Sequence, residues 1–396
     1  MQNSMHDSLM PNYQRLPVCF ERGDGCNLFD SKGEKYIDAL SGIAVCGLGH
    51  AHPRLSAALS DQVSKLWHTS NLYRIELQEQ LADRLASLSG LNSAFFCNSG
   101  AEANEAAIKL ARKYAHDRGI TKPVILSMEG SFHGRTLGAL SATGNEKAHT
   151  GFYPLLAGFE HFEFGCTEEV ERRAVDKNVI AVLVEPIQGE GGVVVPEKNY
   201  LKKLREICNV TDSLLMVDEV QTGIGRTGNW FAFQKDGIVP DVLSLAKGLG
   251  NGIPIGACLA SEKLSSTFSS GAHGTTFGGN PLACRVALSV LDTILDEALL
   301  ERAHSLGEFF ITEFTKNLAG LKRVRDIRGQ GLMIGIELDI PCGELVMMAL
   351  KKHVLINVAN TNTVRLLPPL IMADDEAKKV INTVSECVTE FLEKNS

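Results

Sequence analysis

The chain has 396 residues, of which 44% are hydrophobic and 22% are charged, and its formal net charge at pH 7 is −8. This length and composition are typical of a globular protein with a large core, and they exclude a disordered or fibrous chain. The negative charge, without any long basic run, argues against general binding to nucleic acid or to an anionic membrane. Any anionic ligand must therefore be bound by local groups.

The cysteines and the N-terminal residues indicate the cellular compartment in which the protein works. The ten cysteines include no CxxC pair and no zinc-type spacing, and a chain of this length does not need disulfides for stability. The opening residues MQNSMHDSLMPNYQRLP are too polar for a secretory signal, and no apolar run approaches the roughly 20 residues of a membrane span. We therefore expect a soluble, cytoplasmic protein, and we find no readable motif in its first fifteen or so residues.

The middle of the chain alternates short apolar runs with helical patterns. After a stretch with the turn spacing of a small antiparallel sheet, NLFDSKGEKYIDALSGIAVCGLGHAHP, strands are predicted in SAFFCNSG, KPVILSMEG, NVIAVLVEP, SLLMVDEV and DVLSLAKG, with a helix in AEANEAAIKLARKYAHDRG. Strands that lack polar alternation and are separated by helices indicate a mainly parallel sheet covered on both faces.

The C-terminal part reads as a second, α+β region. A long helical stretch begins at GGNPLACRVA, and strands are predicted in LMIGIELD and VLINV. We expect residues 1–60 to contribute to a small domain, residues 61–277 to form a large α/β domain, and residues 278–396 to form the small α+β domain.

Ligands of open parallel sheets bind outside the carboxyl ends of the strands, so polar residues at those ends are candidate site residues. Ser99, Gly100 and Ala101 begin a helix directly after a predicted strand. Backbone N–H groups at the positive end of that helix could hold a phosphate. The alternative is a simple helix cap, because Ser99 and Glu102 also fit the S-x-x-E capping box.

A second strand end carries Asp218, which follows the apolar run SLLMV. An ionised aspartate at this position needs a cationic or hydrogen-bonding partner. Gly223, Gly225 and Gly228 match G-x-G-x-x-G, the pattern of a dinucleotide-binding turn. The following residues, NWFAFQKDGIVPD, have Asn, Gly and Pro where that motif requires an amphipathic helix. This context argues against a nicotinamide or flavin site.

Two further strand ends carry charged residues. Lys247 lies between the run VLSLA and a glycine-rich loop, and a lysine there either extends to water or is retained for chemistry. Glu185 and Glu190 follow VIAVLV and could form a glycosidase-like pair or a metal site. No histidine in ligand spacing accompanies them, so we expect no metal.

A basic loop, SFHGRT, adds Phe132, His133 and Arg135; taken singly, the first fits a core position and the last a surface charge. Taken together, the strand-end features match the requirements of pyridoxal phosphate. They comprise a helix N-terminus for the phosphate, an aromatic side chain for the flat ring, an aspartate for the cationic ring nitrogen and a lysine for the aldehyde. Lys247 is then predicted to be the Schiff-base lysine.

Six ordered motifs across nearly the whole chain resemble the class III aminotransferases of fold type I: CNSGAEANEAAIKLAR, SFHGRTLGALSATG, VEPIQGEGG, VDEVQTGIGRTG, AKGLGNGIPIGA and GTTFGGNPLACRVA. SNLYRIELQEQLADRL and VRLLPPLIM resemble the members that act on N2-acetylornithine. The resemblance thus implies reversible, ping-pong transfer of the distal amino group of acetylornithine to 2-oxoglutarate, in arginine biosynthesis. Enzymes acting on ornithine, succinylornithine or 4-aminobutyrate share most of these motifs, and an aminomutase would use the same lysine and aspartate.

The resemblance also implies a role for individual residues. Lys247 would form the Schiff base and move the proton, and Asp218 would pair with the pyridinium nitrogen. The other cofactor-binding residues would contact the phosphate, the phenolic oxygen and the two faces of the ring: Ser99, Gly100, Ala101, Phe132, Glu185, Val220 and Gln221. Thr276 would reach the phosphate of a second subunit, which implies a homodimer with sites at the interface.

Four residues are implied for the small-molecule substrates. Arg135, with Thr275 nearby, would bind a substrate carboxylate. Arg365 would bind the α-carboxylate of glutamate, and Glu190 would cover that arginine when the amino substrate is present. A removable ion pair of this kind would let one pocket accept two unlike substrates in turn. His133 receives no role from the resemblance.

Overall fold

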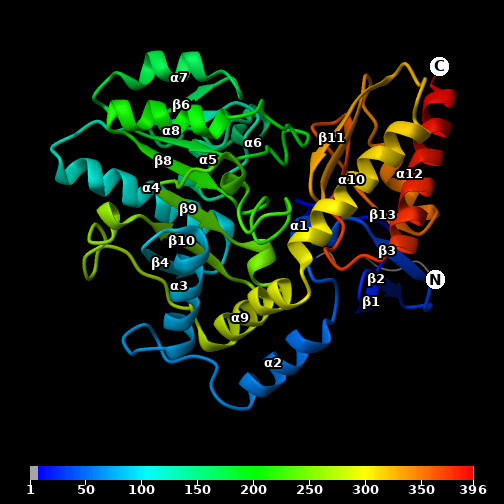
Figure 1. The fold of residues 1–396 in the computed structure, drawn as a ribbon, viewed down its shortest axis with the longest axis horizontal. Coiled ribbons are helices and arrows are strands. Elements are labelled where there is room, and N and C mark those ends of the chain that lie inside the picture. Colours follow the sequence, from blue (N-terminus) through cyan, green and yellow to red (C-terminus); the bar gives the residue numbers. More distant parts are fainter. Residues whose placement is uncertain (1–7, 396) are drawn as a thin grey trace.

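The computed structural model describes residues 8–395 and has a seven-stranded sheet at the centre of its larger part (Figure 1). In spatial order the strands of this sheet are β4 (Ser93–Cys97), β10 (Gly256–Ala260), β9 (Val242–Leu245), β8 (Leu214–Asp218), β7 (Val179–Val184), β5 (Val124–Met128) and β6 (Phe159–Phe162). Strand β10 is antiparallel to both of its neighbours, whereas the other pairs are parallel. Six of the seven strands therefore end at the same edge of the sheet.

Both faces of this sheet are covered, which explains why its strands show no polar alternation. In β7, Ala181 and Leu183 belong to one apolar cluster and Val182 and Val184 to another. The first cluster includes the apolar face of α4 (Gly100–Asp117), and the second includes residues of α3 (Glu76–Ser89), α8 (Tyr200–Thr211) and α9 (Pro281–Asp296). Successive side chains of a strand point to opposite faces, so a strand between two helical layers must be apolar throughout.

Short helices and turns complete the larger part. The remaining α-helices up to α8 are α1 (Ser41–Ala44), α2 (Pro53–Val63), α5 (Leu137–Ala142), α6 (Glu146–His149) and α7 (Thr167–Ala174). Three 3-10 helices follow: η1 (Ala232–Asp236), η2 (Lys247–Leu249) and η3 (Glu262–Leu264). Among residues 8–395 no helix is both long and apolar enough to cross a membrane.

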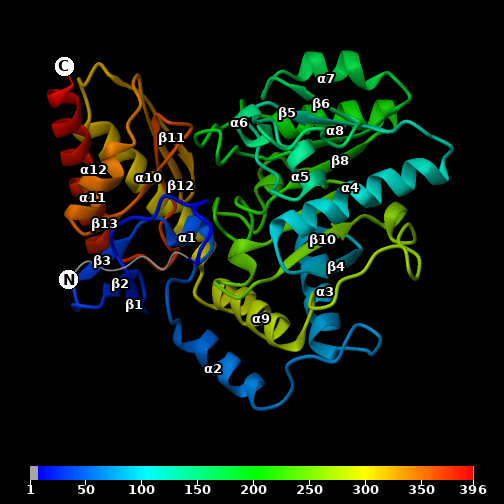
Figure 2. The same cartoon turned by 180° about the vertical axis from the view of Figure 1, so that it is seen from behind.

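Two four-stranded sheets and three helices form the smaller part, which Figure 2 shows from behind. One sheet has the order β1 (Phe20–Asp24), β2 (Asn27–Asp30), β3 (Lys35–Asp38), β13 (Val354–Leu355), and the other has the order β11 (Val324–Gln330), β12 (Met333–Leu338), β15 (Thr363–Leu366), β14 (Asn357–Ala359). The helices are α10 (Leu299–Asn317), α11 (Glu344–Lys351) and α12 (Asp374–Lys394).

The N-terminal strands are joined to the C-terminal part by β13, which pairs in parallel with β3. The stretch VLINV, predicted as one strand, is divided between β13 and β14, which lie in different sheets. Because the chain changes sheet within these residues, a pattern of apolar side chains alone does not reveal the break.

Helix α10 approaches the turn between β11 and β12 closely at Gly307, where an added Cβ would lie 2.1 Å from the carbonyl oxygen of Gly331. We predict that Gly307→Ala lowers the free energy of unfolding by about 1–3 kcal/mol, because overpacking outweighs the roughly 1 kcal/mol by which alanine favours a helix. Thermal or urea unfolding measures the change. Gly343→Ala is the matched control, because no atom lies within 4 Å of its added Cβ. An unchanged or higher stability of Gly307→Ala would contradict the prediction.

Candidate active site

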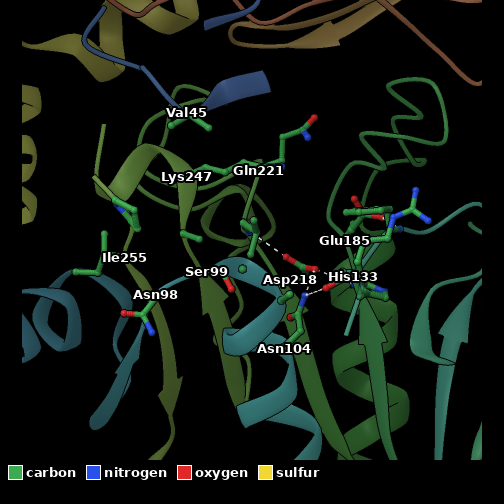
Figure 3. A pocket seen from close by; sticks show the side chains of 18 of the residues that line it. Val45, Asn98, Ser99, Asn104, His133, Glu185, Asp218, Gln221, Lys247 and Ile255 are labelled. Carbon is green, nitrogen blue, oxygen red and sulfur yellow. Dashed lines mark hydrogen bonds and ion pairs between the residues drawn. The ribbon is translucent and has the colours of Figure 1, made fainter. Parts of the chain in front are cut away.

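A cavity of about 440 Å³ lies at the edge of the large sheet where the six strands end (Figure 3). Its wall combines residues from the strand ends and from three loops. Among the lining residues are Val45, Asn98, Ser99, Gly100, Ala101, Asn104, Phe132, His133, Arg135, Glu185, Glu190, Asp218, Val220, Gln221, Lys247 and Ile255. Most of the residues implied by the sequence therefore lie around one cavity.

One wall of the cavity is the N-terminus of α4, which begins at Gly100. Ser99 caps this helix: its Oγ accepts a hydrogen bond of 3.2 Å from the backbone N–H of Glu102. The first N–H groups of an α-helix have no partner within the helix, so the cap and an anion site are compatible. An added Cβ on Gly100 would lie 2.6 Å from Val220, so only glycine lets the backbone approach this closely.

Asp218, at the end of β8, lies at the floor of the cavity and is buried. Its Oδ1 accepts a hydrogen bond of 2.9 Å from the N–H of Val220, and its Oδ2 accepts one of 2.7 Å from Asn104. His133 Nδ1 lies 2.8 Å from the same Oδ2. The buried carboxyl group of Asp218 therefore has three polar partners.

Lys247 follows β9 and extends across the cavity towards Gln221 (Figure 3). Its backbone φ is +43°, a left-handed conformation that is rare for a residue with a side chain. Burial, and then the nearby positive charge of Arg365, lower the pKa of Lys247 below its usual value of 10.5. A lowered pKa increases the fraction of neutral amine, which is the nucleophilic form.

Glu185 is the most perturbed carboxyl group of the cavity. Burial, opposed by His133, raises its pKa from 4.5 to about 7. Its two oxygens accept hydrogen bonds from backbone N–H groups, at 3.0 Å from Phe132 and 3.2 Å from Gly189. The carboxyl group thus holds the Phe132 loop to the loop after β7.

Arg365, on β15, has a fully buried side chain that makes three polar contacts. Its Nη2 pairs with Glu190 Oε1 at 2.8 Å, its Nε donates to Asn357 Oδ1 at 3.0 Å, and its Nη1 lies 3.5 Å from Gln221 Oε1. The side chain of Glu190 is 37% exposed, in contrast to that of its buried partner. Glu190 is therefore the partner that can move towards water at the lower cost.

Arg135 differs from Arg365 in every respect. It is exposed, and its guanidinium carbon lies 5.5 Å from the centre of the Phe132 ring. Within residues 8–395 no ion pair involving Arg135 is seen. A free cation at the mouth of the cavity is available to an anionic ligand.

Thr275 and Thr276 lie apart from this cavity in the same chain. Thr275 Oγ1 is 3.4 Å from Asn98 Nδ2, and Thr275 lines a neighbouring cavity with Asn71 and His273. Thr276 is exposed. Within one chain, neither threonine is among the residues that line the cavity with Arg135.

Several polar residues of the site were missed by sequence reasoning. Asn104 contacts Asp218 from 114 positions away in the sequence, and Asn357 contacts Arg365 from the neighbouring strand β14. A buried asparagine on the apolar face of α4 is the one sequence signal that could have indicated Asn104. The rejected dinucleotide motif, residues 223–228, forms a turn followed only by the 3-10 helix η1.

The residues of the cavity fit pyridoxal phosphate on the observations above. The helix N-terminus with its glycine cradle suits a phosphate, Phe132 and Val220 supply apolar groups for a flat ring, and Asp218 and Lys247 suit its ring nitrogen and aldehyde. Among the described residues there is no group of three or more histidine, cysteine or acidic side chains arranged to hold a metal ion.

Comparison with known proteins shows relatives of nearly the same length. The family model for class III aminotransferases matches residues 9–388. An acetylornithine aminotransferase of Nitrosomonas europaea is 56% identical over 97% of this chain and 98% of the relative. One from Aquifex aeolicus is 48% identical over 96% of this chain and 99% of the relative.

Solved structures agree in fold. An ornithine aminotransferase of Toxoplasma gondii has a TM-score of 0.95 at 34% identity and covers 98% of this chain and 94% of its own. An N-acetylornithine aminotransferase of Stenotrophomonas maltophilia has a TM-score of 0.85 at 36% identity, covering 96% and 98%. Fold, cavity and relatives together define a pyridoxal phosphate-dependent aminotransferase of fold type I. The chain belongs to the class III aminotransferase family.

The raised pKa of Glu185 predicts a pH dependence of stability. Its carboxyl pKa is about 7 in the folded protein against a usual 4.5, so the folded state holds the proton more tightly than the unfolded chain. The free energy of unfolding contributed by this group therefore falls as the pH rises through this interval, and the loss persists above it. We predict that Glu185→Gln is stabilised relative to wild type by about 1–3 kcal/mol near pH 8, with a smaller difference near pH 5.

Chemical denaturation of the wild type and the variant at matched pH values measures this difference. Glu163→Gln is the control, because Glu163 is exposed and has no ion-pair partner among the described residues. A difference between wild type and Glu185→Gln that does not change with pH would contradict the prediction.

Proposed function

We propose that the enzyme transfers the distal amino group of N2-acetylornithine to 2-oxoglutarate and acts in arginine biosynthesis. The observation that carries this proposal is the ion pair between buried Arg365 and partly exposed Glu190, with a second, free arginine, Arg135, at the cavity that Glu190 lines. Glutamate has two carboxylates and acetylornithine has one, so a site for both needs one cation that is always available and one that can be covered. The names of the similar proteins support the same substrate.

Pyridoxal phosphate, when bound, supplies an electron-withdrawing ring conjugated to an aldehyde carbon. In our proposal Lys247 would hold that carbon through its amine and would move the proton at the substrate carbon. Asp218 would hold the proton on the ring nitrogen, and Gln221 would donate to the phenolic oxygen. Ser99, Gly100 and Ala101 would bind the phosphate.

The two arginines bind the carboxylates of different substrates. For glutamate, Arg365 binds the α-carboxylate through a bidentate, charge-assisted pair once Glu190 has moved away. For acetylornithine, the distal amine reacts, so the α-carboxylate lies towards Arg135 and Glu190 stays on Arg365. In the proposed homodimer, Thr275 of one chain would lie beside the carboxylate that Arg135 of the other chain binds.

We further propose that the enzyme is a cytoplasmic homodimer in which Thr276 of each chain completes the phosphate site of the other. Thr276 is exposed, and so is the large apolar side chain of the next residue, Phe277. The segment after α2 exposes three more large apolar side chains, Trp67, Leu72 and Tyr73. Exposed apolar side chains of this size support an interface with a second chain. The ten free cysteines are consistent with a reducing compartment. The proposed large domain, residues 61–277, would provide most of this interface and of the cofactor site.

Ornithine is the second candidate for the amino substrate, because the T. gondii ornithine aminotransferase matches the fold with a TM-score of 0.95. A survey of half-reactions separates the candidates. The cofactor-loaded enzyme is mixed with acetylornithine, ornithine, succinylornithine, succinyl-diaminopimelate or 4-aminobutyrate, and the loss of the cofactor absorbance is followed. The proposal requires the fastest loss per molar amine with acetylornithine, and a faster reaction with ornithine would overturn it.

The role of Lys247 predicts that Lys247→Ala abolishes turnover while the protein stays folded and still binds the phosphate group. Loss of proton transfer alone typically costs about 10²–10⁴-fold, and loss of the nucleophilic amine adds to this. Steady-state rates and borohydride reduction measure the two effects. Lys202→Ala, an exposed lysine on α8, is the control. Near-native turnover in Lys247→Ala would refute the assignment.

The covering role of Glu190 predicts opposite effects of two substitutions. Glu190→Ala leaves Arg365 available and favours the glutamate half-reaction over the acetylornithine half-reaction by about 10-fold or more, whereas Arg365→Ala does the reverse. Single-turnover kinetics of each variant with each amine measures the ratio, since steady-state rates mix the two halves. Equal losses for both amines in both variants would show that the pair is only structural.

A further inference from the structure

His133 lies against the aspartate at the floor of the cavity, yet nothing above gives it a function. Its side chain is fully buried, and its Nδ1 is 2.8 Å from Asp218 Oδ2 (Figure 3). An ionised carboxylate can only accept hydrogen bonds, so Nδ1 must carry the proton and donate it. His133 is therefore a donor to Asp218.

The loop that carries His133 is fixed independently of this contact. Its backbone N–H donates to Thr143 Oγ1 at 2.9 Å, and its carbonyl oxygen accepts from Asn104 Nδ2 at 2.7 Å. The same Asn104 nitrogen donates to Asp218 Oδ2 at 2.7 Å. Asn104 thus links the backbone of the loop to the carboxylate and sets the distance between the imidazole and the acid.

The other ring nitrogen of His133 points to no partner. Nε2 is buried without a hydrogen bond among the described residues. A buried polar atom without a partner lowers stability. A phenylalanine ring at this position would avoid that cost, so a gain at Nδ1 must compensate for it.

The two carboxylate oxygens of Asp218 have different sets of hydrogen-bond partners. Both side-chain donors, His133 and Asn104, are on Oδ2, whereas Oδ1 accepts only the backbone N–H of Val220 among the described contacts. Hydrogen bonds to the charged form keep a buried carboxylate ionised. Oδ1 is left as the oxygen with capacity for a further donor.

We propose that His133 is a positioning residue for the reaction: its Nδ1–H and Asn104 hold Asp218 ionised and oriented, so that the aspartate keeps the ring nitrogen of the cofactor protonated. This inference rests on the proposed roles of Lys247 and Asp218. It adds a second layer of donors behind the aspartate and gives a reason for a histidine directly after the aromatic Phe132.

The test uses the full-length enzyme loaded with pyridoxal phosphate that carries ¹⁵N in the ring, whose resonance reports protonation of that nitrogen. His133→Phe removes the donor and keeps an aromatic ring. His133→Asn places an amide nitrogen near the position of Nδ1 and should restore it. We expect His133→Phe to shift the resonance towards the unprotonated form and to lower kcat about 10- to 100-fold with little change in KM, the loss expected for one hydrogen bond to a charged group. We expect His133→Asn to retain the wild-type resonance.

His161→Asn is the matched control, because His161 is a partly buried neighbour that contacts the carbonyl of Ala142 and not Asp218. Asn104→Ala removes the second donor on Oδ2 and should shift the resonance in the same direction, which keeps the test decisive if His133→Phe does not fold. An unchanged resonance in these variants, with the cofactor retained, overturns the inference alone. A wild-type enzyme whose labelled cofactor is not fixed to Lys247 by borohydride, or whose ring nitrogen is unprotonated, overturns the proposed roles of Lys247 or Asp218 as well.

Discussion

The burial of opposite charges at one edge of an apolar sheet is the constraint on which this structure depends. Lys247, Asp218 and Glu185 line one cavity, Arg365 is bound to Glu190 in its wall, and the strands beneath them are apolar on both faces. A buried charge without a partner costs several kcal/mol, roughly the whole stability margin of many domains. Two of these groups have close partners within the site: Asp218 has polar partners from α4 and the Phe132 loop, and Arg365 has Glu190. For the other two, burial lowers the pKa of Lys247 and raises that of Glu185, which favours their neutral forms. The loops can vary only in ways that keep this balance.

The backbone at the cavity is shaped by the same requirement. Lys247 has a φ of +43°, and Gly100 lies so close to Val220 that a Cβ would overlap with it. The left-handed conformation of Lys247 costs about 1–3 kcal/mol and persists only when the surroundings fix it. The lysine turn follows directly on the fully buried strand β9, which is paired with the equally buried strand β8. A rigid core thus supports a strained and charged rim.

Sequence reasoning located the parts of this site that follow from local patterns. The central strands were predictable because burial on both faces removes polar residues from them, and the residues just after them, such as Asp218 and Lys247, stand out by contrast. Contacts that depend on the path of the chain were not predictable. Asn104 reaches Asp218 across 114 positions, and VLINV changes sheet at its centre without any change in composition. The contact between Thr275 and Asn98 likewise depends on how distant loops pack.

The two arginines of the site show how environment gives one residue type two properties. Arg365 is held by Asn357 from its own sheet and by Glu190 from a loop of the large sheet, and its side chain is fully buried. Its buried charge always requires an anion, and a ligand carboxylate can replace Glu190 without leaving that charge unpaired. Because Glu190 is partly exposed, its release into water recovers much of the hydration that the ligand loses on binding. The exchange of one carboxylate for another at Arg365 therefore has a small net cost in free energy. Exposed Arg135, in contrast, gains an anionic partner that it lacks without the ligand.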